Sequence, residues 1–249
     1  MTVYRCEDSL ESIFTAIYLS YEENRDAEDT YLALDDNPML FAEDVRIQPD
    51  SARAVKVMRT LERRFGEEDY LRVCTALAST DNEKAQAVYR TVVKGLDERC
   101  ARGHLFDNLT DCYVMQTFSM ARKADREINH LREFLRFQEL ENGILYAKIG
   151  PGCNALTFLM PHFADRLPVE NFVIYDNTRN LFGIHPARQQ WYLLSGEETE
   201  PELRFSEEEK EYQELFRHFC RTVSIKEREN LKLQRNLLPL RFREYMIEF

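Results

Sequence analysis

The chain has 249 residues, of which 44% are hydrophobic, and its formal net charge is -11 at pH 7. This length fits one large domain or two small ones with a real hydrophobic core. No apolar run reaches about 18 residues and the first residues lack a signal-peptide pattern, so we expect a cytoplasmic protein without a membrane span.

The negative charge is unevenly distributed, and this keeps a local basic site possible. Residues 1–50 hold three arginines and 13 acidic residues, a net charge of -10, whereas residues 210–249 hold nine basic and six acidic residues, a net charge of +3. The overall balance argues against a generic nucleic-acid-binding protein, but the asymmetry allows one basic surface on an acidic chain.

Helical periodicity dominates the first hundred residues. Apolar residues recur at helical spacing over residues 10–21, 51–64, 69–78 and 82–94. The acidic segment 24–50 contains Pro38 and Pro49 and predicts a loop with one short strand near residues 45–47. We therefore predict a helical N-terminal subdomain over residues 1–105.

A long amphipathic helix follows. Asn108 to Asp111 form an N-terminal capping pattern, and the helix is predicted to run to about Arg132. At 100° per residue, Arg122, Arg126 and His130 share one face, opposite Met120, Ala124, Ile128 and Leu131. A solvated face above a hydrophobic core explains this pattern as well as a binding surface does.

After this helix the sequence periodicity changes from the 3.6 residues of a helix to the two residues of a strand. This change predicts a β-hairpin. Asn142-Gly143 stands between two β-like runs and favours a two-residue type I′ turn. In that register Phe137 opposes Lys148, and Glu139 opposes Tyr146. Pro151-Gly152 ends the second strand.

The remaining elements complete an α+β fold. We predict a helix over residues 155–166 that contains Pro161, an antiparallel pair over 172–175 and 181–184, an edge strand over 191–194, and C-terminal helices over 207–220, 225–235 and from Pro239 onward. The prediction is a helical N-terminal part, a small mostly antiparallel β-sheet with a crossing helix, and a helical C-terminal cover. Residues 106–249 form the predicted core and are expected to be continuous with residues 1–105.

Catalytic and cofactor motifs are missing from the sequence. The five histidines and six cysteines show no zinc or iron–sulfur spacing, so no metal is expected. Glycine-rich nucleotide loops and a G-x-S-x-G elbow do not occur, so no cofactor is expected and the sequence does not decide whether the chain is an enzyme.

A polyanion-binding surface is the best-supported site. Arginine makes forked contacts to phosphate, and exposed aromatic rings stack on unpaired bases. Basic and aromatic residues gather over about 70 residues around the predicted hairpin. The candidate nucleic-acid-binding residues are Arg122, Arg126, His130, Arg136, Phe137, Tyr146, Lys148, Arg166 and Arg179, and Arg132 lies in the same run.

Five segments resemble one bacterial family. They are YRCEDSLESIFTAIYLSYEE, HLREFLRFQE, PHFADR, FVIYDNTRN and ERENLKLQRNLLPLRFREY. Together they resemble the "probable DNA metabolism protein" family, a domain of unknown function, and the resemblance covers most of the chain. The matching positions are His130, Phe134, Arg136, Phe137, His162, Phe163, Arg166, Asp176, Arg179, Asn230 and Pro239. Gln138 and Leu237-Leu238 depart from the family pattern, which argues against a base-contact or redox role there.

The resemblance implies a context in DNA damage or modification. Members of the family are usually encoded beside a putative radical-SAM protein for DNA modification or repair, and some are fused to a uracil-DNA glycosylase-type domain. Because this chain has no C-x-x-x-C-x-x-C cluster, radical chemistry would belong to the partner protein.

Three functional hypotheses follow. The first is an accessory protein that binds single-stranded or damaged DNA and acts with a radical-SAM partner. The second is a nucleobase- or nucleotide-processing enzyme in which His162 and Asp176 form an acid–base pair. The third is a protein-interaction module whose acidic N-terminal part binds a basic partner.

Overall fold

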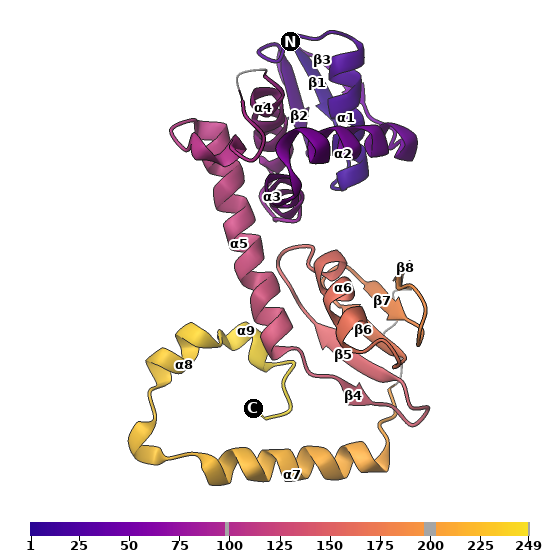
Figure 1. The fold of residues 1–249 in the computed structure, drawn as a ribbon, viewed down its shortest axis with the longest axis vertical. Coiled ribbons are helices and arrows are strands. Elements are labelled where there is room, and N and C mark those ends of the chain that lie inside the picture. Colours follow the sequence, from indigo (N-terminus) through magenta and orange to yellow (C-terminus); the bar gives the residue numbers. More distant parts are fainter. Residues whose placement is uncertain (98–99, 197–202, 249) are drawn as a thin grey trace. The chain divides into compact units, whose positions relative to one another are not determined.

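The computed structural model describes residues 1–97, 100–196 and 203–248. The chain forms two compact units, unit 1 (Met1–Asp125) and unit 2 (Arg126–Phe249), and helix α5 (Cys112–Phe134) contains residues of both. The fold is α+β, as predicted (Figure 1). The predicted domain boundary after residue 105 stays a prediction, because a division into compact units does not test independent folding.

Unit 1 combines helices with a three-stranded parallel sheet of order β2-β1-β3. The strands are β1 (Thr2–Arg5), β2 (Thr30–Ala33) and β3 (Glu43–Arg46). The helices are α1 (Leu10–Glu22), α2 (Ser51–Phe65), α3 (Glu67–Leu77), α4 (Lys84–Leu96) and the 3-10 helix η1 (Leu105–Asp107). The predicted helices are present, but the N-terminal part is not purely helical. We missed β1 and β2 because both are short and almost entirely buried, so they lack the alternation that marks a strand.

Unit 2 is built on a five-stranded sheet of order β4-β5-β6-β7-β8. Its strands are β4 (Gln138–Glu139), β5 (Leu145–Ile149), β6 (Phe172–Asp176), β7 (Leu181–His185) and β8 (Tyr192–Ser195). Helix α6 (Leu156–Arg166) crosses from β5 to β6, which are parallel, and the other neighbouring strands are antiparallel. The structure thus confirms a mostly antiparallel sheet with a crossing helix.

The C-terminal part of unit 2 is helical, as predicted. It contains α7 (Glu207–Val223), the 3-10 helix η2 (Lys226–Arg228), α8 (Leu231–Leu237) and α9 (Leu240–Arg243) (Figure 1). Only α9 among these helices carries a buried side chain, that of Phe242. The side chain of Lys226 lies outside the described part of the chain, so this comparison leaves it out.

The register of the β4–β5 hairpin differs by one residue from our prediction. Glu139 pairs with Leu145, and Gln138 pairs with Tyr146. The Gly143 N–H donates to the Leu140 carbonyl at 2.8 Å, and only Gly143 of the Asn-Gly pair has a positive φ, +76°. A type I′ turn needs a positive φ at both central residues, so the chain forms a three-residue loop instead, which shifts the pairing.

The contact between α6 and β7 depends on Gly183. A Cβ atom at this position would lie 2.4 Å from Met160 Sδ and 3.1 Å from Leu156 Cδ1. Both neighbours are fully buried, so neither can move freely. The absence of a side chain at Gly183 therefore sets how closely the crossing helix approaches the sheet.

We predict that Gly183→Ala destabilises the protein by about 1–3 kcal/mol through overpacking. Thr157→Ala, at an exposed position of the same helix, is the control and is expected to change stability by less than about 0.5 kcal/mol. Urea unfolding followed by circular dichroism measures both. Equal stability of the two variants would contradict the close approach of α6 to β7.

Candidate nucleic-acid interface

Helices α5 and α6 present a group of basic side chains, which we call the basic face: Arg126, Arg132, His162 and Arg166. The three arginines are exposed and His162 is partly buried. Arg132 Nη2 donates to the Phe158 carbonyl of α6 at 3.1 Å, which fixes this end of α5 against α6. The face therefore has a defined geometry within unit 2.

The electrostatics of His162 show that Arg132 and Arg166 lie close to it. Burial lowers the pKa of His162 below its ordinary value of 6.5, and the guanidinium groups of Arg132 and Arg166 lower it further. Asp165 is the one carboxylate that opposes this effect. A phosphate that bound beside these arginines would oppose their effect and raise the pKa of His162.

The arginines of the basic face keep their charges available. Within the described residues, none of Arg126, Arg132 and Arg166 forms an ion pair with a carboxylate, and Arg132 donates only to neutral oxygens, including Asn129 Oδ1 at 3.3 Å. Exposed carboxylates are nearby in sequence at Glu133 and Asp165. The guanidinium groups can thus bind phosphate without breaking an existing ion pair.

A buried carboxylate on α5 binds the backbone of the loop that follows β5. Glu127 of α5 is 7% exposed and accepts hydrogen bonds from the N–H groups of Gly152 and Cys153, both at 2.9 Å. Arg241 of α9 pairs with it at 3.1 Å. Burial alone would raise the pKa of Glu127, but these hydrogen bonds and the Arg241 charge lower it below its ordinary value.

A second buried carboxylate, Asp176 at the end of β6, lies near the same loop. It is 0% exposed and accepts hydrogen bonds from the N–H groups of Thr178 and Arg179. Arg179 also pairs with Asp176 and donates to the carbonyls of Pro151 and Gly152. Arg179 therefore holds the two strand ends together and is not a free phosphate ligand.

Other predicted binding residues are also engaged within unit 2. Arg136 pairs with Glu248 at 2.9 Å. The His130 ring lies 6.2 Å from Phe134 and 5.5 Å from Phe242, centre to centre. Both side chains thus help to attach the C-terminal segment, a role that sequence spacing did not indicate.

The prediction that Tyr146 and Phe137 are exposed for base stacking is wrong for Tyr146. Its side chain is only 4% exposed, because β5 is an inner strand of the sheet in which Ala147 and Ile149, on the opposite face, are buried as well. Phe137 is half-buried and contacts the rings of Phe163 and Phe172 edge-on. Lys148 is also half-buried, and Arg122, exposed in unit 1, lies over the Phe118 ring.

His162 and Asp176, the proposed acid–base pair, have different neighbours. His162 lies among Arg132, Asp165 and Arg166, whereas the described contacts of Asp176 are with Thr178 and Arg179. Burial raises the pKa of Asp176, and Arg179 opposes this. No described hydrogen bond or ion pair joins His162 to Asp176, so the geometry gives the acid–base hypothesis no support.

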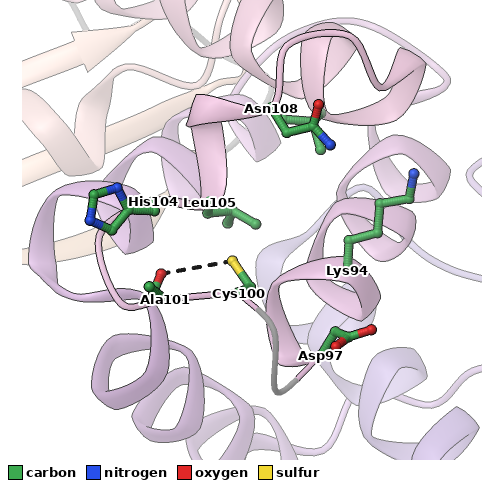
Figure 2. A pocket seen from close by; sticks show the side chains of 8 residues that line it. Lys94, Asp97, Cys100, Ala101, His104, Leu105 and Asn108 are labelled. Carbon is green, nitrogen blue, oxygen red and sulfur yellow. Dashed lines mark hydrogen bonds between the residues drawn. The ribbon is translucent and has the colours of Figure 1, made fainter.

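A pocket of about 430 Å³ in unit 1 brings Cys100 and His104 to one surface. Figure 2 shows that the His104 ring points away from Cys100, whose thiol is directed at the Ala101 carbonyl. His104 Nδ1 instead lies 2.6 Å from Asp107 Oδ2. Burial raises the pKa of the Cys100 thiol, so this pocket lacks an activated nucleophile.

The described residues contain no group of three or more His, Cys, Asp or Glu side chains that could hold a metal ion. No helix among them is long and apolar enough to cross a membrane.

The chain matches a known family model. The model described as "Domain of unknown function (DUF4130)" matches residues 82–248, which include the basic face and both buried carboxylates. No curated protein matches the chain.

We predict that Glu127→Gln destabilises the protein by about 1–3 kcal/mol, because the amide replaces a buried, paired carboxylate. The lowered pKa means that Glu127 contributes its stability above its unfolded pKa and loses it as pH falls through the folded value. Urea unfolding between about pH 3 and pH 7 should therefore show a smaller loss at acid pH for the variant than for the wild type. Parallel pH profiles would contradict this role.

Proposed function

Because the chain belongs to the DUF4130 family, whose description states no activity, we propose a function from the geometry: an accessory protein that binds DNA through the basic face. The observation that carries this proposal is the proximity of Arg132, His162 and Arg166, with no ion pair to a carboxylate for either arginine among the described residues. A phosphate backbone supplies the anions that such a face lacks.

The shape of the face suits a strand of phosphates. Arg126, Asn129 and Arg132 are exposed and follow one another at i, i+3 and i+6 along α5, each turned by about 60° from the one before. They form an oblique ridge whose last member, Arg132, neighbours His162. Two successive intervals of three residues span about 9 Å of helix axis. The guanidinium groups of the two arginines and the amide of Asn129 can donate hydrogen bonds to successive phosphate oxygens along this ridge.

The charge distribution supports the same assignment. Unit 2 has a net charge of -3, with 17 basic and 20 acidic residues, whereas unit 1 has a net charge of -8, with 16 basic and 24 acidic residues. Long-range repulsion of a polyanion is therefore weaker from unit 2. A local basic surface can dominate there, particularly at low ionic strength.

The family resemblance supplies the biological context of this proposal. We propose that the DNA is single-stranded or damaged and that the protein acts with a radical-SAM enzyme for DNA modification or repair. The chain itself would hold the strand, and the chemistry would belong to the partner. Reconstitution of the partner with damaged oligonucleotides, with and without this chain, tests this part separately from DNA binding.

We predict that the double variant R126Q/R166Q binds a single-stranded oligonucleotide about tenfold more weakly than the wild type. Neither side chain makes a described hydrogen bond, so folding should be preserved. Loss of two phosphate contacts should also reduce the slope of log affinity against log salt by about 1.4. Fluorescence anisotropy at several salt concentrations measures both effects.

R59Q/R63Q is the matched control for this experiment. It removes the same charge from two exposed arginines on α2 of unit 1. Its affinity should stay within about twofold of the wild type. An equal loss of affinity in both double variants would show a nonspecific effect of net charge and would contradict a site on the basic face.

We predict a pH dependence of DNA binding through His162. Burial and the neighbouring arginines hold the pKa of His162 low in the free protein, and a bound phosphate raises it, so binding takes up a proton. Affinity should therefore increase as pH falls from about 8 to about 5.5, and His162→Gln should flatten this profile. His104→Gln, in unit 1, is the control and should keep the wild-type profile.

A further inference from the structure

The residues that follow α9 pair with a cation at the end of α5. We call residues 244–248 the strap. Glu248 Oε1 lies 2.9 Å from Arg136 Nη2. The other described hydrogen bonds of Arg136 are two long contacts of 3.4 Å, to the carbonyl oxygens of Glu133 and Leu135 in the chain just before it. Arg136 therefore has one strong partner, and the strap supplies it.

Arg136 belongs to the same stretch of chain as the basic face. It stands four residues after Arg132, and helical hydrogen bonding continues past α5, because the Leu135 N–H donates to the Leu131 carbonyl at 2.9 Å. Four residues of a helix advance about 6 Å along its axis and turn by about 40°. Arg136 is thus the next cation along the ridge that α5 presents.

The contacts that hold the strap are few and incomplete. Met246 is the one buried side chain among residues 244–248, and the Ile247 carbonyl accepts a hydrogen bond from Arg217 Nε at 2.9 Å. Glu248 Oε2 is buried but has no hydrogen-bond partner among the described residues. A buried carboxylate oxygen without a partner costs free energy that hydration would recover, so docking of the strap is only weakly favourable.

Helix α9 provides a fixed point next to the strap. Arg241 pairs with Glu127 at 3.1 Å, and the buried Phe242 ring lies 5.5 Å from the His130 ring, centre to centre. Neither contact involves residues 244–248. The strap can therefore leave Arg136 while α9 stays in place.

We propose that the strap is an intramolecular competitor of DNA: the Glu248 carboxylate takes the place of a phosphate on Arg136, and a bound strand displaces it. This inference rests on the proposed function and adds Arg136 as a binding residue that becomes accessible on displacement. With the strap docked, DNA binds through the basic face alone. With the strap released, Arg136 adds a phosphate contact, and the free energy of release reduces the apparent affinity.

The first test compares two glutamine variants of the full chain by fluorescence anisotropy with a single-stranded oligonucleotide. E248Q weakens the contact with Arg136, so it should bind about threefold more tightly than the wild type. E244Q makes the same charge change at an exposed position of the strap and should stay within about 1.5-fold of the wild type. An E248Q variant that binds no more tightly than E244Q overturns the proposal.

A double-mutant cycle tests whether Arg136 is the residue that the strap covers. R136Q should weaken binding by no more than about twofold in the wild type, where the strap already occupies Arg136, and by about fivefold in E248Q. Equal effects of R136Q in the two backgrounds would mean that Glu248 and Arg136 do not compete with DNA.

Amide hydrogen exchange locates the movement in the full chain. The N–H groups of Tyr245 and Met246 donate to carbonyl oxygens of α9, at 3.2 and 3.1 Å, so displacement of the strap exposes them. Adding the oligonucleotide should speed exchange in residues 244–248 and leave α9 unchanged. Unchanged or slower exchange in the strap overturns the proposal.

The variant R126Q/R166Q separates this proposal from the proposed function. If it loses affinity while E248Q behaves like E244Q, the strap proposal alone fails. If R126Q/R166Q binds like the wild type, or if neither the wild type nor E248Q binds the oligonucleotide, the proposed function fails and the strap proposal fails with it.

Discussion

The buried carboxylate of Glu127 holds together three parts of unit 2 that are distant in the sequence. It belongs to α5, it accepts hydrogen bonds from the loop between β5 and α6, and it pairs with Arg241 of α9. A buried charge is tolerated only when hydrogen bonds and an opposite charge replace its water. The loop, the helix and the C-terminal segment therefore depend on one another for stability.

This arrangement determines where the basic face lies. Helix α5 carries Glu127 towards the interior and Arg126 towards solvent, because adjacent residues of a helix are 100° apart. The loop bound by Glu127 leads directly into α6, which carries His162 and Arg166. The interaction that stabilises unit 2 thus also brings the two basic helices into contact, with Arg132 bonded to the Phe158 carbonyl.

Arginine has two distinct roles in unit 2. Arg136 and Arg179 neutralise buried carboxylates or bind carbonyl groups, so their charges are used within the fold. Arg126 and Arg166 face solvent without such partners among the described residues. The distinction reconciles an acidic chain with a proposed polyanion site, because the charges of Arg126 and Arg166 are not used within the fold.

The sequence by itself determined the helices, the hairpin strands, the antiparallel pair after α6 and the basic character of α5, because these follow from local periodicity and turn residues. Tertiary structure alone decided the parallel pairing of β5 with β6, the burial of Tyr146 and the use of Arg136 as a partner of Glu248, 112 residues away. Periodicity shows which side of an element is apolar, but not which distant residue meets it.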